Sequence, residues 1–151
     1  MMNLELIATV RTHLLQQNAK SLNQQGRCLY RGPEGKKCAI GCLIPDDRYE
    51  ERFEGHGFAG HSYAPGIDIS NPSSCFLALI RAAGISPSQL PLAAELQAIH
   101  DSHPVEEWAA RLDYIEADEQ AIAKLRNLDS AGPTSIPSSA LLPVKPGRRE
   151  D

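Results

Sequence analysis

The sequence contains no hydrophobic run of the ~18–20 residues that a membrane-spanning helix needs. Its first residues lack a basic segment followed by an apolar one, so we expect no secretory signal. Basic residues number 15 against 19 acidic ones, and the formal net charge of -4 gives no support to direct nucleic-acid binding. These absences predict a cytoplasmic protein that needs neither a membrane nor a nucleic acid as its partner.

Cysteines and aromatic residues are also few. Four cysteines in 151 residues are too few and too clustered for a disulfide-rich scaffold, and a reducing cytosol would keep them as free thiols. A Cys28–Cys38 bridge stays open as an alternative, because a hairpin would let the two residues face each other. Aromatic residues make up 5% of the chain, so we expect a core of aliphatic side chains with Phe76 and Trp108 as bulky anchors.

The chain divides into a body, residues 1–128, and a tail, residues 129–151. The length of 151 residues suits a single globular domain. The tail holds four prolines and four serines without a helical or strand period. Such a segment buries too little apolar surface to offset the entropy of ordering it. We therefore expect one domain followed by a flexible, disordered tail.

Apolar periodicity predicts an α+β fold that is mostly helical. The clearest helix spans residues 104–128, where Trp108 and Leu112 belong to one apolar stripe. Residues 27–31 and 36–44 flank a Gly- and Pro-containing segment and predict one short β-hairpin, although residues 38–44 fit a buried helix equally well. A long Gly-rich loop follows over residues 55–72. The expected helices, four or five in all, cover residues 4–19, 46–54, 91–101 and 104–128, with a further helix that Ser73 or Ser74 caps and Gly84 ends.

A pattern of cysteines and histidines matches the spacing of a Cys2His2 zinc site. Three residues separate Cys38 from Cys42, thirteen separate Cys42 from His56, and four separate His56 from His61. The histidines lie in a Gly-rich loop and not one turn apart on a helix, so we expect no cofactor and keep zinc as an alternative. A second alternative is thiol chemistry centred on Cys38, which two lysines precede and a loop histidine could approach.

Acidic residues gather in two segments, and basic residues in another. Residues 11–37 carry six basic residues and one acidic residue. The acidic segments are residues 46–54, with five acidic and two basic residues, and residues 101–119, with seven acidic residues and Arg111. The adjacent His100 and Asp101, with His103 nearby, suggest a catalytic or metal-binding group. A solvated charged surface explains the acidic clusters equally well, so whether the protein is an enzyme stays open, with a binding protein favoured.

Recognition by charge is the remaining interpretation. An acidic face suits a basic surface on another protein, unless the opposed segments neutralise each other within the fold. The Gly-rich loop adds side chains suited to recognition. The candidate binding residues are Glu106, Glu107, Glu116, Glu119, Asp46, Asp47, His56, Phe58, His61 and Tyr63.

Residues 38–47, which read CAIGCLIPDD, and the preceding CLYRGPEGKK resemble a family of small phage- and prophage-encoded proteins of unknown function. Tyr49, the His100–Asp101 pair and Trp108 are similar to that pattern as well. The resemblance implies a phage accessory protein in a bacterial cytoplasm. We therefore expect it to bind and modulate or inhibit a host or defence protein, as anti-CRISPR and other anti-defence proteins do. A virion or assembly component is a further alternative.

Overall fold

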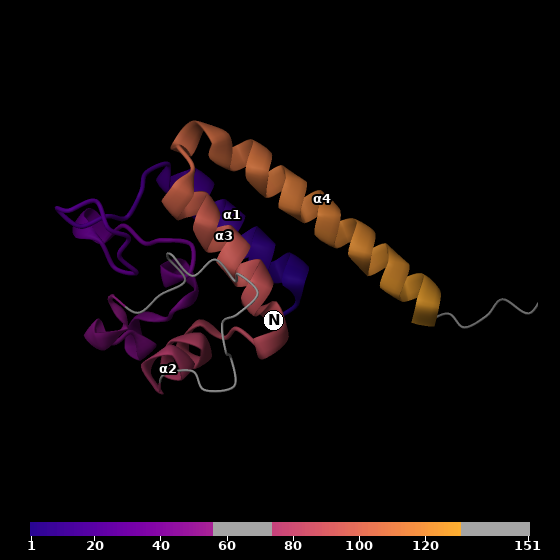
Figure 1. The fold of residues 1–151 in the computed structure, drawn as a ribbon, viewed down its shortest axis with the longest axis horizontal. Helices are drawn as coiled ribbons and strands as arrows, with labels where there is room; N and C mark the ends of the chain where they lie inside the picture. Colours follow the sequence, from indigo (N-terminus) through magenta and orange to yellow (C-terminus); the bar gives the residue numbers. More distant parts are fainter. Residues whose placement is uncertain (56–73, 131–151) are drawn as a thin grey trace, which may run out of the picture.

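The computed structural model describes residues 1–55 and 74–130, and this part of the chain is mostly helical (Figure 1). It has no strand. The expectation of a mostly helical fold is therefore confirmed, whereas the expected β-hairpin is wrong. The helix expected over residues 46–54 is wrong as well, because this segment forms two separate 3-10 turns. The helices are α1 (Asn3–Gln17), α2 (Ser74–Ala83), α3 (Leu90–Ser102) and α4 (Val105–Ser130), with 3-10 turns at Pro33–Gly35, Gly41–Leu43, Asp46–Arg48, Glu51–Phe53 and Pro87–Gln89.

The boundaries of the helices follow local sequence signals. Helix α1 begins after Met2, whose backbone N–H donates to the Glu5 carboxylate at 2.8 Å. Asn3 is the first helical residue, one residue before the predicted start of this helix at residue 4. Before α3, the Ser86 and Gln89 side chains form a reciprocal capping box. Helix α4 ends at Ser130, two residues beyond the predicted end of the body.

Two hydrophobic cores lie side by side in the fold. The first, which we call the helical core, joins α1, α3 and α4 around Trp108 and Leu112, both 0% exposed. The second, which we call the turn core, packs α2 and the start of α3 against the 3-10 turns around Phe53 and Leu79. In Figure 1, α1 and α3 run next to each other, and α2 lies with the turns on the other side of α3 from α4.

Residues 38–44 connect the two cores and do not form the second arm of a hairpin. Ala39 belongs to the helical core, whereas Cys38 and Ile40 belong to the turn core. A strand would need its backbone groups for a ladder, but the Ile40 N–H donates to the side chain of Gln97 at 3.0 Å. The segment therefore forms the single 3-10 turn Gly41–Leu43. It is neither the strand nor the buried helix that the sequence suggested.

Some predictions fall on residues that the structure does not describe. They are the Gly-rich loop beyond Gly55, with His56, Phe58, His61 and Tyr63, and the tail from residue 131 onward.

No single helix within the described ranges is long and apolar enough to cross a membrane. The pair Ser74–Ala83 and Pro87–Ser102 together has the length and composition of a membrane span, but its two helices are bent by 88° at the break between them.

Candidate functional site

The acidic candidates of α4 do not form one face. Glu106 and Glu107 line a groove between α3 and α4. Glu116 pairs with Arg11 of α1 at 3.5 Å. Glu119 is 9% exposed and accepts a hydrogen bond from the Asn3 side chain at 2.9 Å. The structure therefore separates these four carboxylates into a groove pair and two residues that hold α1 against α4.

The basic segment and the acidic segments neutralise each other in part. Arg11 pairs with Asp113 as well as with Glu116. Arg31 lies 2.9 Å and Lys37 lies 3.6 Å from the same carboxylate oxygen of Asp46. Asp47, its neighbour, is exposed and has no ion-pair partner in the described part of the chain. Ion pairs within the fold therefore neutralise part of the opposed charge of these segments.

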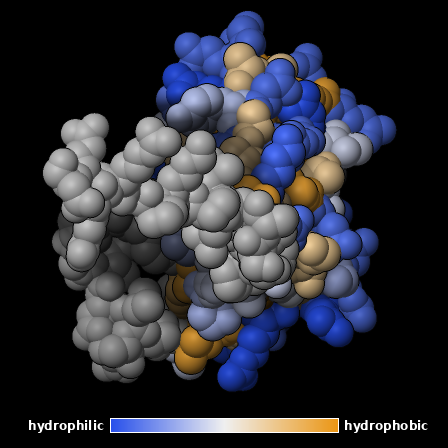
Figure 2. Space-filling view, turned by 90° about the vertical axis from the view of Figure 1, so that its right-hand side faces the viewer, coloured by the Kyte–Doolittle hydropathy of each residue, from blue (hydrophilic) through white to orange (hydrophobic). Residues whose placement is uncertain are grey.

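The groove between α3 and α4 keeps its negative charge. It has a volume of about 670 Å³, and four carboxylates surround it. In Figure 2, hydrophilic residues cover most of the coloured surface, with hydrophobic residues between them. The lining residues are Glu95, Ala98, Ile99, His103, Glu106, Glu107, Ala110, Arg111, Tyr114, Ile115 and Asp118.

The two cysteines of the zinc pattern pack in different cores. Cys38 is 0% exposed within the turn core, and Cys42 packs against the helical core. Burial raises the pKa of Cys42 to about 12, and its thiol donates to the Ala39 carbonyl at 3.0 Å. A zinc ligand must be a thiolate, so this environment disfavours Cys42 as a ligand. The zinc pattern itself stays a prediction, because His56 and His61 lie outside the described residues.

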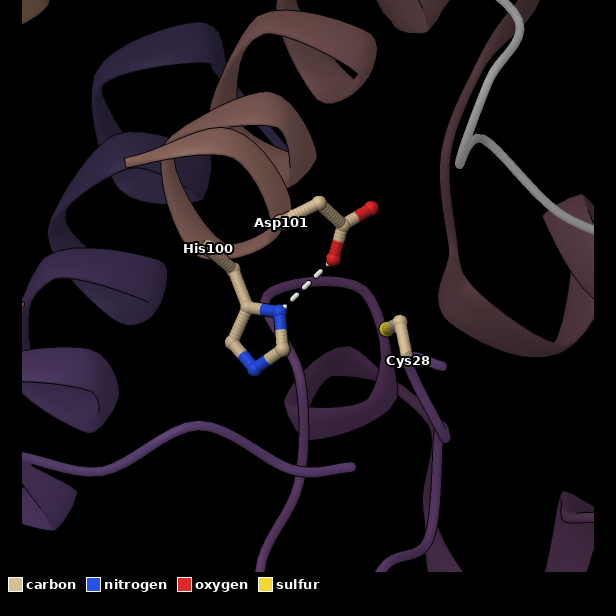
Figure 3. A group of neighbouring side chains, drawn as sticks. All are labelled: Cys28, His100 and Asp101. Carbon is tan, nitrogen blue, oxygen red and sulfur yellow. Dashed lines mark hydrogen bonds and ion pairs between the residues drawn. The ribbon is translucent and has the colours of Figure 1, made fainter. Parts of the chain in front are cut away.

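A second group of side chains surrounds the last turn of α3. His100 and Asp101 project from that turn, and Cys28 approaches them from the loop that follows α1 (Figure 3). One potential ligand atom from each of the three residues lies within 4.8 Å of the others. His103, which the sequence suggested as a partner, instead faces Glu107 at 3.4 Å. The His100–Asp101 pair was thus visible in the sequence, and its neighbour is a cysteine.

The hydrogen bonds of His100 define its tautomer. Its Nε2 accepts the Ser21 backbone N–H at 2.9 Å, so the ring proton is on Nδ1, which donates to Asp101 at 2.8 Å. Trp108 stacks on the ring with centroids 5.7 Å apart. Burial lowers the pKa of His100, whereas Asp101 and Cys28 raise it, with a net upward direction. The Ser21 N–H opposes that rise, because a protonated Nε2 would face another donor.

Gln97 joins the group to the rest of the fold. Its side-chain NH2 donates to Asp101 at 2.8 Å and to the sulfur of Cys28 at 3.2 Å, while its carbonyl accepts the Ile40 N–H. The second carboxylate oxygen of Asp101 is buried and has no hydrogen-bond partner among the described atoms. Gln97 precedes Asp101 by four residues, a helical spacing that could have drawn attention to it.

Cys28 also contacts the turn core. It is partly buried and packs against that core, which contains Cys38. The hydrogen bond with Cys38 and burial raise the pKa of Cys28 far above its usual range, and His100 opposes that rise. All four cysteines are free thiols in this structure.

Fold and site together define a small helical protein with an acidic groove and a buried Cys–His–Asp group. Comparisons with protein-family models, with curated proteins and with solved structures give no match to this chain. The functional argument therefore rests on these two features and on the chemistry of their residues.

Proposed function

We propose that this protein acts by protein–protein interaction and binds a basic, amphipathic segment of its partner in the groove between α3 and α4. The composition of the groove carries this proposal, because acidic side chains stand around an apolar floor. Ala98 and Ile99 contribute to the floor from α3, and Ala110 and Ile115 contribute from α4. This combination suits an amphipathic helix, which places its apolar face in a groove and its charges at the edges.

The charge of the groove is not balanced from within. Arg111 supplies the one Lys or Arg side chain among the lining residues, and it pairs with Glu107 at 3.3 Å. Glu95, Glu106 and Asp118 are exposed and have no ion-pair partner within residues 1–55 and 74–130. Lysines or arginines of a partner would supply the missing charge and speed the encounter at low salt.

The biological role that we propose is that of a phage-encoded accessory protein. The resemblance of residues 28–47 to small phage proteins supports a bacterial host or defence protein as the partner. Binding would then modulate or inhibit that partner, as in anti-CRISPR or other anti-defence activity. A basic nucleic-acid-binding surface of a defence protein has the charge that the groove requires.

Affinity capture from bacterial lysate with two matched variants tests the proposal. The groove variant is Glu95→Lys with Glu106→Lys and Asp118→Lys, three exposed positions at the groove. The control, Asp47→Lys with Glu51→Lys and Asp129→Lys, makes the same change in net charge at exposed positions elsewhere.

We expect the wild type and the control to retain the same partner and the groove variant to lose it. A photo-crosslinking residue in place of Tyr114, which is 75% exposed at the groove, should then label a Lys- or Arg-rich helical segment of that partner. Retention by the groove variant, loss in the control alone, or a labelled segment without basic residues would contradict the proposal.

A further inference from the structure

The last turns of α4 carry an exposed apolar stripe, which we call the terminal stripe and which consists of Ala121, Leu125 and Leu128. Leu125 is 63% exposed and Leu128 is 69% exposed, and neither belongs to the helical core or the turn core. Figure 1 shows this end of α4 projecting beyond α1 and α3. Spacings of four and three residues place the stripe on one face of the helix, as in helices that dock in a groove.

Basic charge accompanies the terminal stripe. Residues 120–128 contain Lys124 and Arg126 and no acidic residue. The Arg126 side chain is 70% exposed and lies 3.9 Å from the Glu119 carboxylate. Lys124 is exposed and has no ion-pair partner in the part of the chain that the structure describes. These residues therefore form a basic, amphipathic helical segment, which is the kind of ligand that suits the groove between α3 and α4.

This segment cannot enter the groove of its own chain. The α4 residues that line the groove extend from Glu106 to Asp118, and residues 120–128 continue the same helix, Val105–Ser130. A continuous helix advances by ~1.5 Å per residue, so the segment lies beyond the groove along the helix axis and does not fold back onto it. Only a second copy of the chain can therefore place this segment in the groove.

Two α4 helices that run antiparallel about a two-fold axis fill both grooves at once, because each copy gives and receives the same segment. Arg111 and Asp129 are eighteen residues apart, which is about five helical turns, so they lie on the same side of α4. When the axis passes near Gln120, Asp129 of one copy lies opposite Arg111 of the other. Leu125 then lies beside Tyr114 of the second copy, which is 75% exposed. The two surfaces are thus complementary in charge and in apolar character.

We propose that residues 120–129 of each α4 bind in the groove between α3 and α4 of a second copy, in an antiparallel two-fold dimer. This inference rests on the proposed function of the groove as a site for basic amphipathic helices. Lys124 and Arg126 supply the positive charge that the groove lacks, and the terminal stripe covers its apolar floor. The dimer and the partner complex use the same groove, so each excludes the other.

Sedimentation velocity of the full-length protein over a range of concentrations tests the proposal. A contact limited to two helical segments is at the small end of specific interfaces, so the dimer should dissociate on dilution and at high salt. The segment variant is Lys124→Glu with Arg126→Glu, and it is compared with the groove variant defined above. The control, Arg27→Glu with Arg48→Glu, makes the same change in net charge as the segment variant at exposed positions elsewhere. We expect the wild type and this control to dimerise as the concentration rises, and the segment and groove variants each to stay monomeric.

An equimolar mixture of the segment variant and the groove variant is the sharpest sample. Each groove in a mixed pair faces a segment of opposite charge, so we expect the mixture to dimerise although neither variant does so alone. A photo-crosslinking residue in place of Tyr114 should then join that position to residues 120–130 of a second copy. Isotope-labelled protein mixed with unlabelled protein identifies such a crosslink as intermolecular.

Several results would overturn the dimer. They are a wild type that is monomeric at every concentration, a segment variant that dimerises like the wild type, a mixture that stays monomeric, and a crosslink from the groove to residues 131–151 of the same chain. If the wild type is monomeric but the groove variant still loses its lysate partner, self-association is wrong and the proposed function stands. If the mixture dimerises but the groove variant retains its lysate partner, self-association stands and the groove is not the site for that partner.

Discussion

The helical core and the turn core are stabilised in different ways. Apolar stripes on α1, α3 and α4 meet in the helical core, where the helices satisfy their own backbone groups. In the turn core, side chains satisfy the backbone: the Glu54 carboxylate accepts the N–H groups of Tyr30 and Arg31 at 3.1 and 3.0 Å. Helices thus assemble by surface complementarity, whereas irregular turns depend on particular polar residues from distant parts of the chain.

The largest effect that separates the two cores is expected at Trp108. This side chain is 0% exposed, stacks on His100 and donates to the His103 carbonyl at 3.0 Å. Trp108→Ala should lower the free energy of unfolding by ~3–5 kcal/mol, measured by urea denaturation, because it leaves a large cavity. Tyr114→Ala on the same helix should change it by less than ~0.5 kcal/mol, since Tyr114 is 75% exposed. Equal effects at the two positions would contradict the helical core as described.

Gly41 tests how tightly the turn core is packed. A Cβ atom at this position would overlap the carbonyl oxygen of Tyr30, a backbone atom that cannot rotate away. Gly41→Ala should therefore cost ~1–3 kcal/mol in urea denaturation.

Gly26→Ala is the comparison for Gly41, because a Cβ at Gly26 meets no atom within 4 Å and the residue has φ of 77°. Its expected cost is ~1–2 kcal/mol from backbone strain alone. A neutral Gly41→Ala would show that the approach to Tyr30 is looser than the structure indicates.

Gln97 tests the dependence of the turn core on polar side chains. Gln97→Leu keeps the volume but leaves the Ile40 N–H and the Asp101 carboxylate without this partner. We expect a loss of ~1–3 kcal/mol in thermal or urea unfolding, the usual cost of an unsatisfied buried polar group. Gln16→Leu, at an exposed position of α1, should be near neutral. If both variants are neutral, buried hydrogen bonds do not organise the turns.

The smallest effect is expected at the exposed ion pairs of the turn region. Asp46 pairs with Arg31 and Lys37, but its side chain is 89% exposed. Asp46→Asn should cost no more than ~0.5 kcal/mol, and less at high salt, because solvent screens exposed pairs. A cost above ~1 kcal/mol in low-salt urea denaturation would mean that this charge helps to hold the turns together.

The helices were predictable because their information is local. The spacing of Trp108 and Leu112 indicated α4 directly from the sequence. The turns were not predictable in this way. Residues 38–44 show an apolar run that suits several structures, and the choice depends on Gln97, which is 57 residues away from Ile40.

The candidate sites divide along the same line. Glu106 and Glu107 were recognisable as acidic residues at a helix start, but the groove that they line exists only because α4 packs against α3. His100 and Asp101 were recognisable as neighbours in the sequence. Their neighbour Cys28 was not recognisable, because no local spacing connects it to α3. It lies 69 residues before Gln97, to which it is hydrogen-bonded.

By itself, the amino-acid sequence determined the helical content, the apolar stripes and the total charge, which depend on residue type and spacing along the chain. The tertiary structure decided which charges are neutralised, which cysteines are buried and which N–H groups receive side-chain partners. These outcomes depend on contacts between residues far apart in sequence, such as Asn3 with Glu119 and Ser21 with His100. Burial then changes the chemistry of each group, because a proton or charge inside the protein depends on its few neighbours.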